Sequence, residues 1–189
     1  MKHCSMKHCS ILFFLVLLLV ACDDNSLIKS EMDRFLNTKV ELNLDSMAYA
    51  SELNTIQDSV VHYKMKDYAY IVYFDSLSCS DCAINHLSDW TDLTLTKHLN
   101  DNDISLLFII SPPKKKIKKI IDKLCKNTLM NDQIYVDTMS VFARTNPNIP
   151  SNSILHTFLI NEQGKVLLIG SPLHNNKIMD LSLEIIKSK

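Results

Sequence analysis

Apolar residues are grouped along the chain in a pattern that alternates between strand-like runs and helix-like spacing. Three short runs are almost continuously apolar, which is typical of strands buried on both faces of a sheet. Between them, apolar residues recur every three to four positions, as on one face of a helix. The order predicts strand, helix, strand, helix and strand over residues 68–75, about 80–99, 104–110, about 113–126 and 133–137. An alternating order of this kind indicates a parallel sheet.

The pattern changes after residue 137. A short helical stretch is expected near residues 140–145. Two strand-like runs, 155–161 and 165–169, are separated by the turn Glu162-Gln163-Gly164 and predict an antiparallel hairpin. A closing helix is expected near residues 176–186. The fold class is therefore α/β, with a central mixed sheet flanked by helices.

The first residues carry the features of a secretory signal peptide. Basic residues precede an apolar run from Ile11 to Val20, which is about half of the roughly 20 residues that a membrane-spanning helix needs. Leu19-Val20-Ala21-Cys22 resembles a bacterial lipobox, which predicts cleavage before Cys22 and a lipid on its thiol. The alternative is an ordinary signal peptide that leaves Cys22 unmodified. We expect a lipid-anchored protein of the cell envelope, facing the periplasm or the exterior.

These features predict three segments, which are a signal peptide (1–21), a tether with an N-terminal extension (22–55) and the main domain (56–189). Within the extension, the polar residues 23–26 are interpreted as a tether, the spacing over 27–36 predicts a helix, and the alternation over 39–44 predicts a strand.

Composition excludes several kinds of partner. Removal of residues 1–21 takes away Lys2 and Lys7 and leaves a net charge near −3, so nothing points to nucleic acid. The whole chain has only two glycines, Gly164 and Gly170, which excludes glycine-rich loops that cradle phosphates.

The chemistry centres on Cys79-Ser80-Asp81-Cys82, which lies between the predicted strand 68–75 and the helix that follows it. Two cysteines at this spacing bring their sulfurs within bonding reach, and the dipole of a helix N-terminus favours a thiolate. The Asp81 carboxylate opposes the dipole by raising the thiol pKa. This balance favours a reductase or isomerase over a strong oxidant.

The chain resembles the thioredoxin-like superfamily, and within it the TlpA-type thiol-disulfide oxidoreductases of the cell envelope. The similarity covers about residues 56–189 and is carried by 70–82 and 156–166. It implies a thioredoxin fold in which Cys79 is the attacking thiol and Cys82 the resolving thiol, with no bound cofactor. The lipobox and the few glycines also resemble the lipoproteins of Bacteroides-type bacteria.

The chain departs from the family pattern at four positions. Leu155 stands where the family has a cis-proline, with Pro150 nearby, and Tyr73 stands where it has a buried acid, a role for which Asp75 is the substitute candidate. The family's tryptophan before the motif is Ser78, and the proline expected in the helix is absent near Leu87. The surface around the cysteines is therefore expected to be more polar than is usual in the family.

Other residues have structural and functional interpretations. Cys125 lies on the apolar stripe of the helix 113–126 and is interpreted as a structural thiol, with pairing to another protein as the alternative. The lysines of that helix suit a solvated face or anionic lipid headgroups. Trp90 is expected to pack the helix after the motif onto the sheet. His156 and His174 flank the hairpin, and two thiolates with one imidazole would suit copper, as in Sco-type metallochaperones.

Three functions remain open from the sequence. The first is thiol-disulfide exchange with protein or small-molecule substrates. The second is a noncatalytic binding lipoprotein in which Cys79 and Cys82 form a structural disulfide, and the third is copper delivery.

Overall fold

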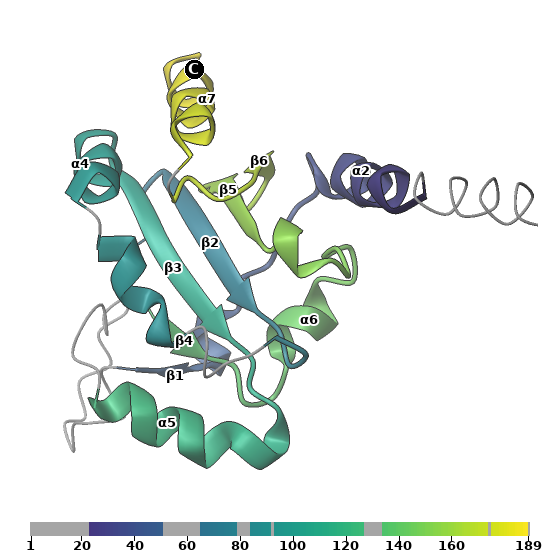
Figure 1. The fold of residues 1–189 in the computed structure, drawn as a ribbon, viewed down its shortest axis with the longest axis vertical. Coiled ribbons are helices and arrows are strands. Elements are labelled where there is room, and N and C mark those ends of the chain that lie inside the picture. The colour runs from purple at the N-terminus through teal and green to yellow at the C-terminus, as the bar shows by residue number, and fades with distance from the viewer. Residues whose placement is uncertain are drawn as a thin grey trace, which may run out of the picture.

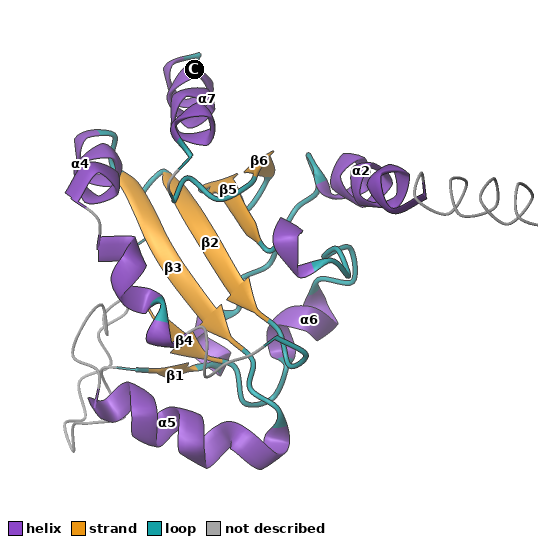
Figure 2. Ribbon diagram, in the orientation of Figure 1, coloured by secondary structure: helices purple, strands orange, loops and turns teal. Residues whose placement is uncertain are grey.

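A computed structural model describes residues 23–50, 65–78, 84–91, 93–126, 134–173 and 175–188. This part of the chain is built on a six-stranded sheet of order β1-β4-β3-β2-β5-β6 (Figures 1 and 2). The strands are β1 (Ala48–Tyr49), β2 (Tyr68–Phe74), β3 (Ile104–Ile110), β4 (Ile134–Val136), β5 (Thr157–Asn161) and β6 (Val166–Ile169). The α-helices are α2 (Asp23–Phe35), α4 (Leu93–Asp101), α5 (Ile117–Lys126), α6 (Val141–Thr145) and α7 (Asn176–Lys187). Short 3-10 helices are η1 (Leu44–Ser46), η3 (Leu87–Thr91), η4 (Lys114–Lys116) and η6 (Ser153–Leu155).

Strand directions confirm the predicted topology. β2, β3 and β4 run parallel, with Phe74 opposite Ile110 and Ile110 opposite Val136. β5 is antiparallel to β2, and β6 is antiparallel to β5. A parallel half is thus followed by an antiparallel hairpin and a closing helix. The fold is thioredoxin-like.

Each face of the sheet carries its own core. The first core, under η3, α4, α5 and α7, contains Leu87, Trp90 and Ile120 packed against the side chains of Tyr70 and Phe108. The second core, under α2 and α6, contains Phe35 and Phe142 packed against Ile71 and Phe158. Because β2 and β3 are covered on both faces, nearly every residue in them is buried, which explains their continuous apolar sequence.

The predicted tether at residues 23–26 is wrong, because these residues form the first turn of α2. The helix packs against the sheet at its far end, where the ring of Phe35 meets that of Phe158 edge-on at a centroid distance of 4.9 Å. Within the described part of the chain, no helix is both long enough and apolar enough to span a membrane.

The predicted strand over 39–44 is also wrong. Its alternation reflects burial, since Val40 is buried while Glu41 is exposed. Among the described residues, this segment forms one isolated β-bridge, between Lys39 and Lys165. The backbone of Glu41 binds a side chain in place of a neighbouring strand, because Asn146 accepts from Glu41 N at 2.8 Å and donates to Glu41 O at 2.8 Å.

The hairpin turn depends on Gly164. Its φ is 80°, a left-handed conformation that favours glycine, and its carbonyl accepts from Val40 N at 2.8 Å. A β-carbon at this position would collide with the Val40 carbonyl oxygen. The turn therefore fixes both the hairpin and the segment after α2.

The helix predicted for about 80–99 is not continuous where the structure describes it. Residues 84 and 85 are helical, η3 follows, and α4 begins at Leu93. Trp90 does pack this region onto the sheet, with its ring edge-on to Phe108 at a centroid distance of 5.6 Å. Smaller differences affect the hairpin, where η6 occupies 153–155 and β5 begins only at Thr157.

Candidate functional site

The predicted site residues are described only in part. Cys79, Ser80, Asp81 and Cys82 lie outside the described residues, as do Cys22 and His174. The described chain ends at Ser78 on one side of the motif and resumes at Ile84 on the other. The surroundings of the motif can therefore be built from the elements that lead into and out of it.

A hydrogen-bonded turn leads from β2 towards the motif. Asp75 directly follows the strand, and its Oδ1 accepts from Leu77 N at 3.1 Å, Ser78 N at 2.6 Å and Ser78 Oγ at 2.6 Å. An aspartate that accepts from the backbone two and three residues ahead stabilises a turn. The side chain is half-buried and is engaged in this turn, so Asp75 holds the residue that immediately precedes Cys79.

The segment after the motif is fixed to the first core. Ile84, Leu87 and Trp90 are 3%, 0% and 7% exposed, and they pack with the inward residues of β2 and β3. The motif thus connects the end of the central strand β2 to a segment that is anchored on the same strand. The sequence predicts both cysteines between these two described segments.

Polar residues gather at the edge of the sheet where the parallel strands end. Ser111 follows β3 and Asp137 follows β4, and both are almost completely buried. The Asp137 carboxylate accepts from Val141 N at 2.8 Å, Phe142 N at 2.9 Å and Ser111 Oγ at 3.2 Å. Asp137 therefore accepts hydrogen bonds from the free backbone N–H groups in the first turn of α6 and links this turn to Ser111 at the end of β3.

Sequence reasoning did not single out Asp137 or Ser111. The available signal was positional, since each residue comes directly after a buried strand of the parallel half. The carboxyl ends of parallel strands share one edge, so the predicted parallel order could have indicated that Asp75, Ser111 and Asp137 lie along the same edge.

Tyr73 occupies the position of the family's buried acid and lies in the second core. Its ring contacts Phe142 and His156, with centroid distances of 4.8 and 5.1 Å. Burial raises the pKa of Tyr73, a hydrogen bond with the Ser111 hydroxyl opposes this rise in part, and the Asp75 and Asp137 carboxylates add smaller increases. A neutral phenol thus replaces an ionisable acid at this position.

His156 is 3% exposed and lies beside Tyr73. Its Nε2 donates to Pro150 O at 2.8 Å, and its buried Nδ1 has no hydrogen-bond partner among the described residues. Its backbone carbonyl accepts from Tyr73 N at 2.9 Å, which extends the pairing of β5 with β2 towards the C-terminal end of β2.

Leu155 ends η6 and is 6% exposed. No peptide bond among the described residues is cis, and this includes the bonds before Pro150 and Leu155. The loop that carries a cis-proline in the family is therefore built differently here. Of the predicted auxiliary residues, Asp75 directly follows β2, His156 is hydrogen-bonded through its carbonyl to Tyr73 near the end of that strand, and Leu155 immediately precedes His156. Asp81 is outside the described residues.

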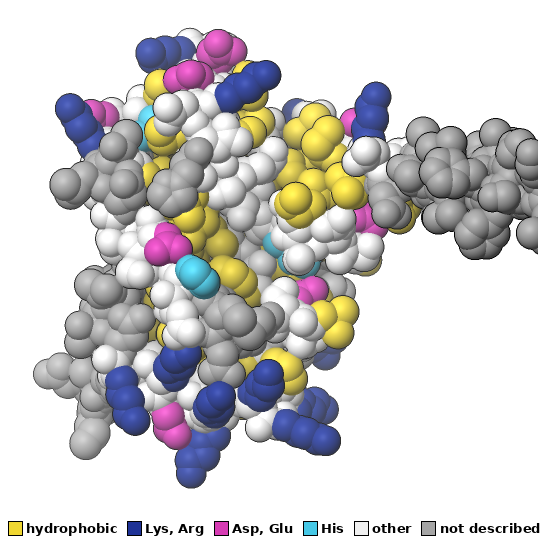
Figure 3. Space-filling model, in the orientation of Figure 1, with side chains coloured by type: hydrophobic (Ala, Val, Ile, Leu, Met, Phe, Trp, Pro, Cys, Tyr) yellow, Lys and Arg dark blue, Asp and Glu magenta, His cyan; other side chains and the backbone are white. Residues whose placement is uncertain are grey.

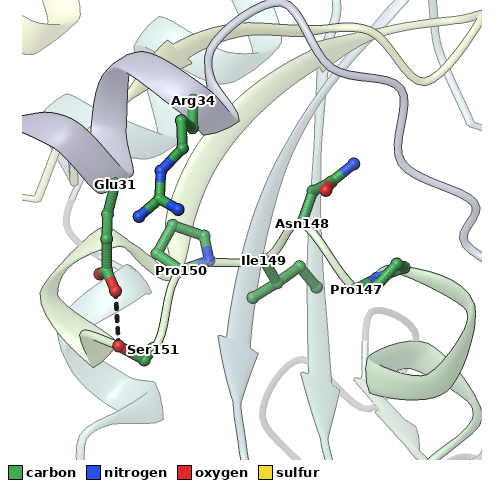
Figure 4. A pocket seen from close by; sticks show the side chains of 7 residues that line it. All are labelled: Glu31, Arg34, Pro147, Asn148, Ile149, Pro150 and Ser151. Carbon is green, nitrogen blue, oxygen red and sulfur yellow. Dashed lines mark hydrogen bonds between the residues drawn. The ribbon is translucent and has the colours of Figure 1, made fainter.

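A surface cavity of about 230 Å³ lies between α2 and the loop 147–151 (Figure 4). Glu31 and Arg34 line it from the helix side. The Glu31 carboxylate accepts from Ser151 Oγ at 2.6 Å and Asn152 N at 3.2 Å, and the Ser151 hydrogen bond is the main cause of its lowered pKa. These contacts join α2 to the loop whose Pro150 carbonyl holds His156.

Among the residues that the structure describes, no group of three or more His, Cys, Asp or Glu side chains is arranged to hold a metal ion. Cys125 is half-buried on α5 and forms no disulfide with another described residue.

Comparison with known proteins gives only distant likenesses. No protein-family model and no curated protein matches the chain. A domain of a possible thiol-disulfide isomerase from Cytophaga hutchinsonii ATCC 33406 is similar over 82% of this chain and 97% of its own, with a TM-score of 0.48 and 12% identity. Yeast Sco1 is similar over 65% of this chain and 85% of its own, with a TM-score of 0.45 and 18% identity.

A thioredoxin-like protein from Bacteroides caccae ATCC 43185 is similar over 66% of this chain and 41% of its own, with a TM-score of 0.41 and 12% identity. Because these TM-scores are all below 0.5, the assignment of the fold rests on the strand order and directions described above.

Proposed function

We propose that this protein is an envelope lipoprotein of the TlpA type, which exchanges disulfides with protein or small-molecule thiols through Cys79 and Cys82. One observation carries the proposal. In a thioredoxin-like sheet, the segment that contains both cysteines connects the end of the central strand β2 to residues packed on the first core. A helix that begins in this segment would place its N-terminal dipole at the first cysteine, which favours the thiolate.

The exchange follows from the order of the two thiols. The Cys79 thiolate attacks one sulfur of a substrate disulfide, forms a mixed disulfide and releases the other substrate sulfur as a thiolate. The Cys82 thiolate then attacks Cys79, closes the Cys79–Cys82 disulfide and releases the second substrate sulfur. Two electrons pass from the protein dithiol to the substrate, which is reduced. Repulsion by Asp81 makes the thiolates less stable and supports a reducing role.

Trapping tests the proposal directly. In Cys82→Ala, Cys79 has lost its resolving partner, so mixed disulfides with substrates should accumulate and be visible on non-reducing gels. Cys79→Ala is the matched control, and Cys125→Ala shows whether the third thiol contributes. If Cys82→Ala traps no partner and the intact protein reduces no disulfide, the proposal is wrong.

A structural disulfide in a noncatalytic binding protein is the second candidate, and the surroundings of Tyr73 favour it. The buried acid that helps to deprotonate the resolving thiol in the family is replaced by a phenol whose pKa is raised by burial. The reduction potential separates the two candidates. A value well below about −300 mV, together with no reduction of insulin disulfides, would support the structural disulfide.

Copper delivery is supported by the buried Nδ1 of His156, for which the described residues supply no hydrogen-bond partner. The burial of His156, which is 3% exposed, weighs against copper delivery, because the ring would have to leave its place beside Tyr73 to reach a metal at the surface. Titration of the reduced protein with Cu(I), compared between the native chain and His156→Leu, tests this role.

Lipid attachment at Cys22 belongs to the same proposal. An alkyne-labelled fatty acid supplied to cells should be incorporated into the protein and lost in Cys22→Ser. The protein would then be held at the membrane, with Cys79 and Cys82 exposed to the periplasm or the exterior.

A further inference from the structure

Lysines are concentrated where the chain leaves β3 and enters α5. We call Lys114, Lys115, Lys116, Lys118 and Lys119 the lysine surface, and all five are exposed. No acidic residue occurs between positions 111 and 121, whereas the whole chain has a formal net charge of −1. Figure 3 shows Lys and Arg side chains gathered in the region of α5. This is a local positive field on a protein that is otherwise slightly acidic.

The position of these lysines is unfavourable for the helix itself. α5 begins at Ile117, so the lysines surround its N-terminal turn, where the helix dipole favours negative charge. Cations at this end of a helix interact unfavourably with the dipole, most strongly at low ionic strength. The buried face of α5, through Ile120 and Leu124, does not require them. The arrangement therefore points to a use of the charge outside the fold.

The lysine surface begins at the same edge of the sheet as the turn that leads into the motif. Phe74 and Ile110, the last residues of β2 and β3, lie opposite each other, and Ser111 N donates to Phe74 O at 2.8 Å. Lys114 follows Ser111 by three residues, and Cys79 follows Asp75 by four. The arrowheads of β2 and β3 in Figure 1 point towards the end of the sheet at which α5 starts.

A membrane is the less suitable occupant. The predicted lipid is carried at residue 22, directly before α2, and Figure 1 places α2 and α5 on opposite sides of the sheet. The strand order agrees, since α5 precedes β4 near one side of the sheet and the segment after α2 bridges to the hairpin at the other. A surface at the edge of the sheet where β2 ends, and away from the start of α2, is better placed for a substrate of the predicted cysteines.

We propose that the lysine surface docks an acidic segment of the protein substrate whose disulfide is exchanged. The proposal rests on the proposed function and assigns its substrate class. Charge complementarity steers association and can raise its rate by about 10 to 10³-fold, with a steep loss at high ionic strength.

The test uses the purified full chain in a nonionic detergent and three disulfide substrates. Two are peptides that differ only in carrying glutamates or lysines beside the same disulfide, and the third is the uncharged bis(2-hydroxyethyl) disulfide. At low salt, the rate constant should be at least about tenfold higher for the acidic peptide than for the basic one. This ratio should fall below about threefold in ~0.5 M salt.

The decisive variant is K114Q/K115Q/K116Q/K118Q/K119Q, which should lose the preference. Its matched control is K29Q/K39Q/K165Q/K177Q/K187Q, which removes five exposed lysines elsewhere and should keep it. Both variants should reduce the uncharged disulfide within about twofold of the native rate, because neither alters the cysteines. Circular dichroism confirms that each variant is folded.

Each other outcome overturns a specific step. Equal rates for the two peptides, with normal reduction of the uncharged disulfide, would refute the docking proposal and leave the proposed function standing. Failure to reduce any disulfide would refute the proposed function. Lysine-dependent binding to mixed micelles of phosphatidylglycerol, with no peptide preference, would assign the surface to a membrane instead.

Discussion

One carboxylate oxygen of Asp75 holds the turn that leads into the motif, and Asp137 and His156 hold neighbouring pieces of backbone in a similar way. Asp75 Oδ1 accepts from two backbone N–H groups and one hydroxyl. Asp137 accepts from the first turn of α6, and His156 donates to Pro150 O. Asp75 therefore holds the turn that precedes the motif in sequence, while Asp137 holds the start of α6 and His156 holds the loop at Pro150.

Asp75→Ala should destabilise the protein by about 1 to 2 kcal/mol, because it removes the acceptor of three hydrogen bonds at a half-buried turn. Asp75→Asn keeps an oxygen acceptor and should lose less. Urea denaturation measures the loss, with Ser76→Ala at the exposed neighbouring position as the control. If Asp75→Ala and Ser76→Ala are equally stable, the turn does not depend on this carboxylate.

At the scale of elements, the sequence was informative where burial alone decides the structure. Residues 104–110 were predicted as a strand with its observed ends, because a strand covered on both faces is apolar throughout. Alternation over 39–44 was misleading, since Asn146, which is more than a hundred residues away, satisfies the backbone of Glu41. Such long-range side-chain contacts have no local signal.

The candidate site shows the same limit. The junction between strand and helix could be placed from local pattern, and Asp75 was recognised as a candidate beside it. The buried Asp137 and Ser111 became neighbours only through the pairing of β3 with β4, and the contact of His156 with Tyr73 required the pairing of β5 with β2. Residues from different elements meet through sheet register, which periodicity does not determine.

The contact between α4 and α7 should make stability depend on pH. His98 Nε2 lies 3.1 Å from Ser182 Oγ, and Ser182 Oγ donates to Met179 O, so the histidine is the donor. Burial lowers the pKa of His98, against the smaller opposite effects of the Asp180 and Asp101 carboxylates. The unfolded chain therefore binds a proton at higher pH than the folded protein does.

The contribution of neutral His98 to the free energy of unfolding should therefore be fully present above about pH 6.5, the ordinary pKa of histidine. It should decrease as the pH falls from this value towards the lowered pKa of the folded protein. His98→Gln keeps an N–H donor and does not titrate. Denaturation midpoints compared between pH 8 and pH 5.5 should fall less in His98→Gln than in the native protein. An identical decrease in both would show that His98 does not contribute.

At the scale of the whole molecule, α2 joins the N-terminal end of the described chain to the sheet. Phe35 is 1% exposed in the second core and Glu31 binds the loop at Ser151, so a lipid at Cys22 would lie directly before a docked helix. The proposed membrane anchor and the end of β2 that leads to the proposed cysteine site would then be held in a fixed relation, in place of the short tether that the sequence predicted. This requires α2 to be part of the same folding unit as the sheet.

Phe35→Ala tests that requirement through the chain's single tryptophan, Trp90, which lies in the first core on the other face of the sheet. Loss of a fully buried phenylalanine should cost about 3 to 5 kcal/mol. If α2 and the sheet unfold together, the fluorescence transition of Trp90 in urea should move to lower concentration by the amount that corresponds to this cost. Leu27→Ala, on the same helix at a position that is 58% exposed, should move the transition by less than about 0.5 kcal/mol. A Trp90 transition unchanged by Phe35→Ala would mean that α2 unfolds separately from the sheet. The proposed lipid at Cys22 would then have no fixed position relative to the end of β2.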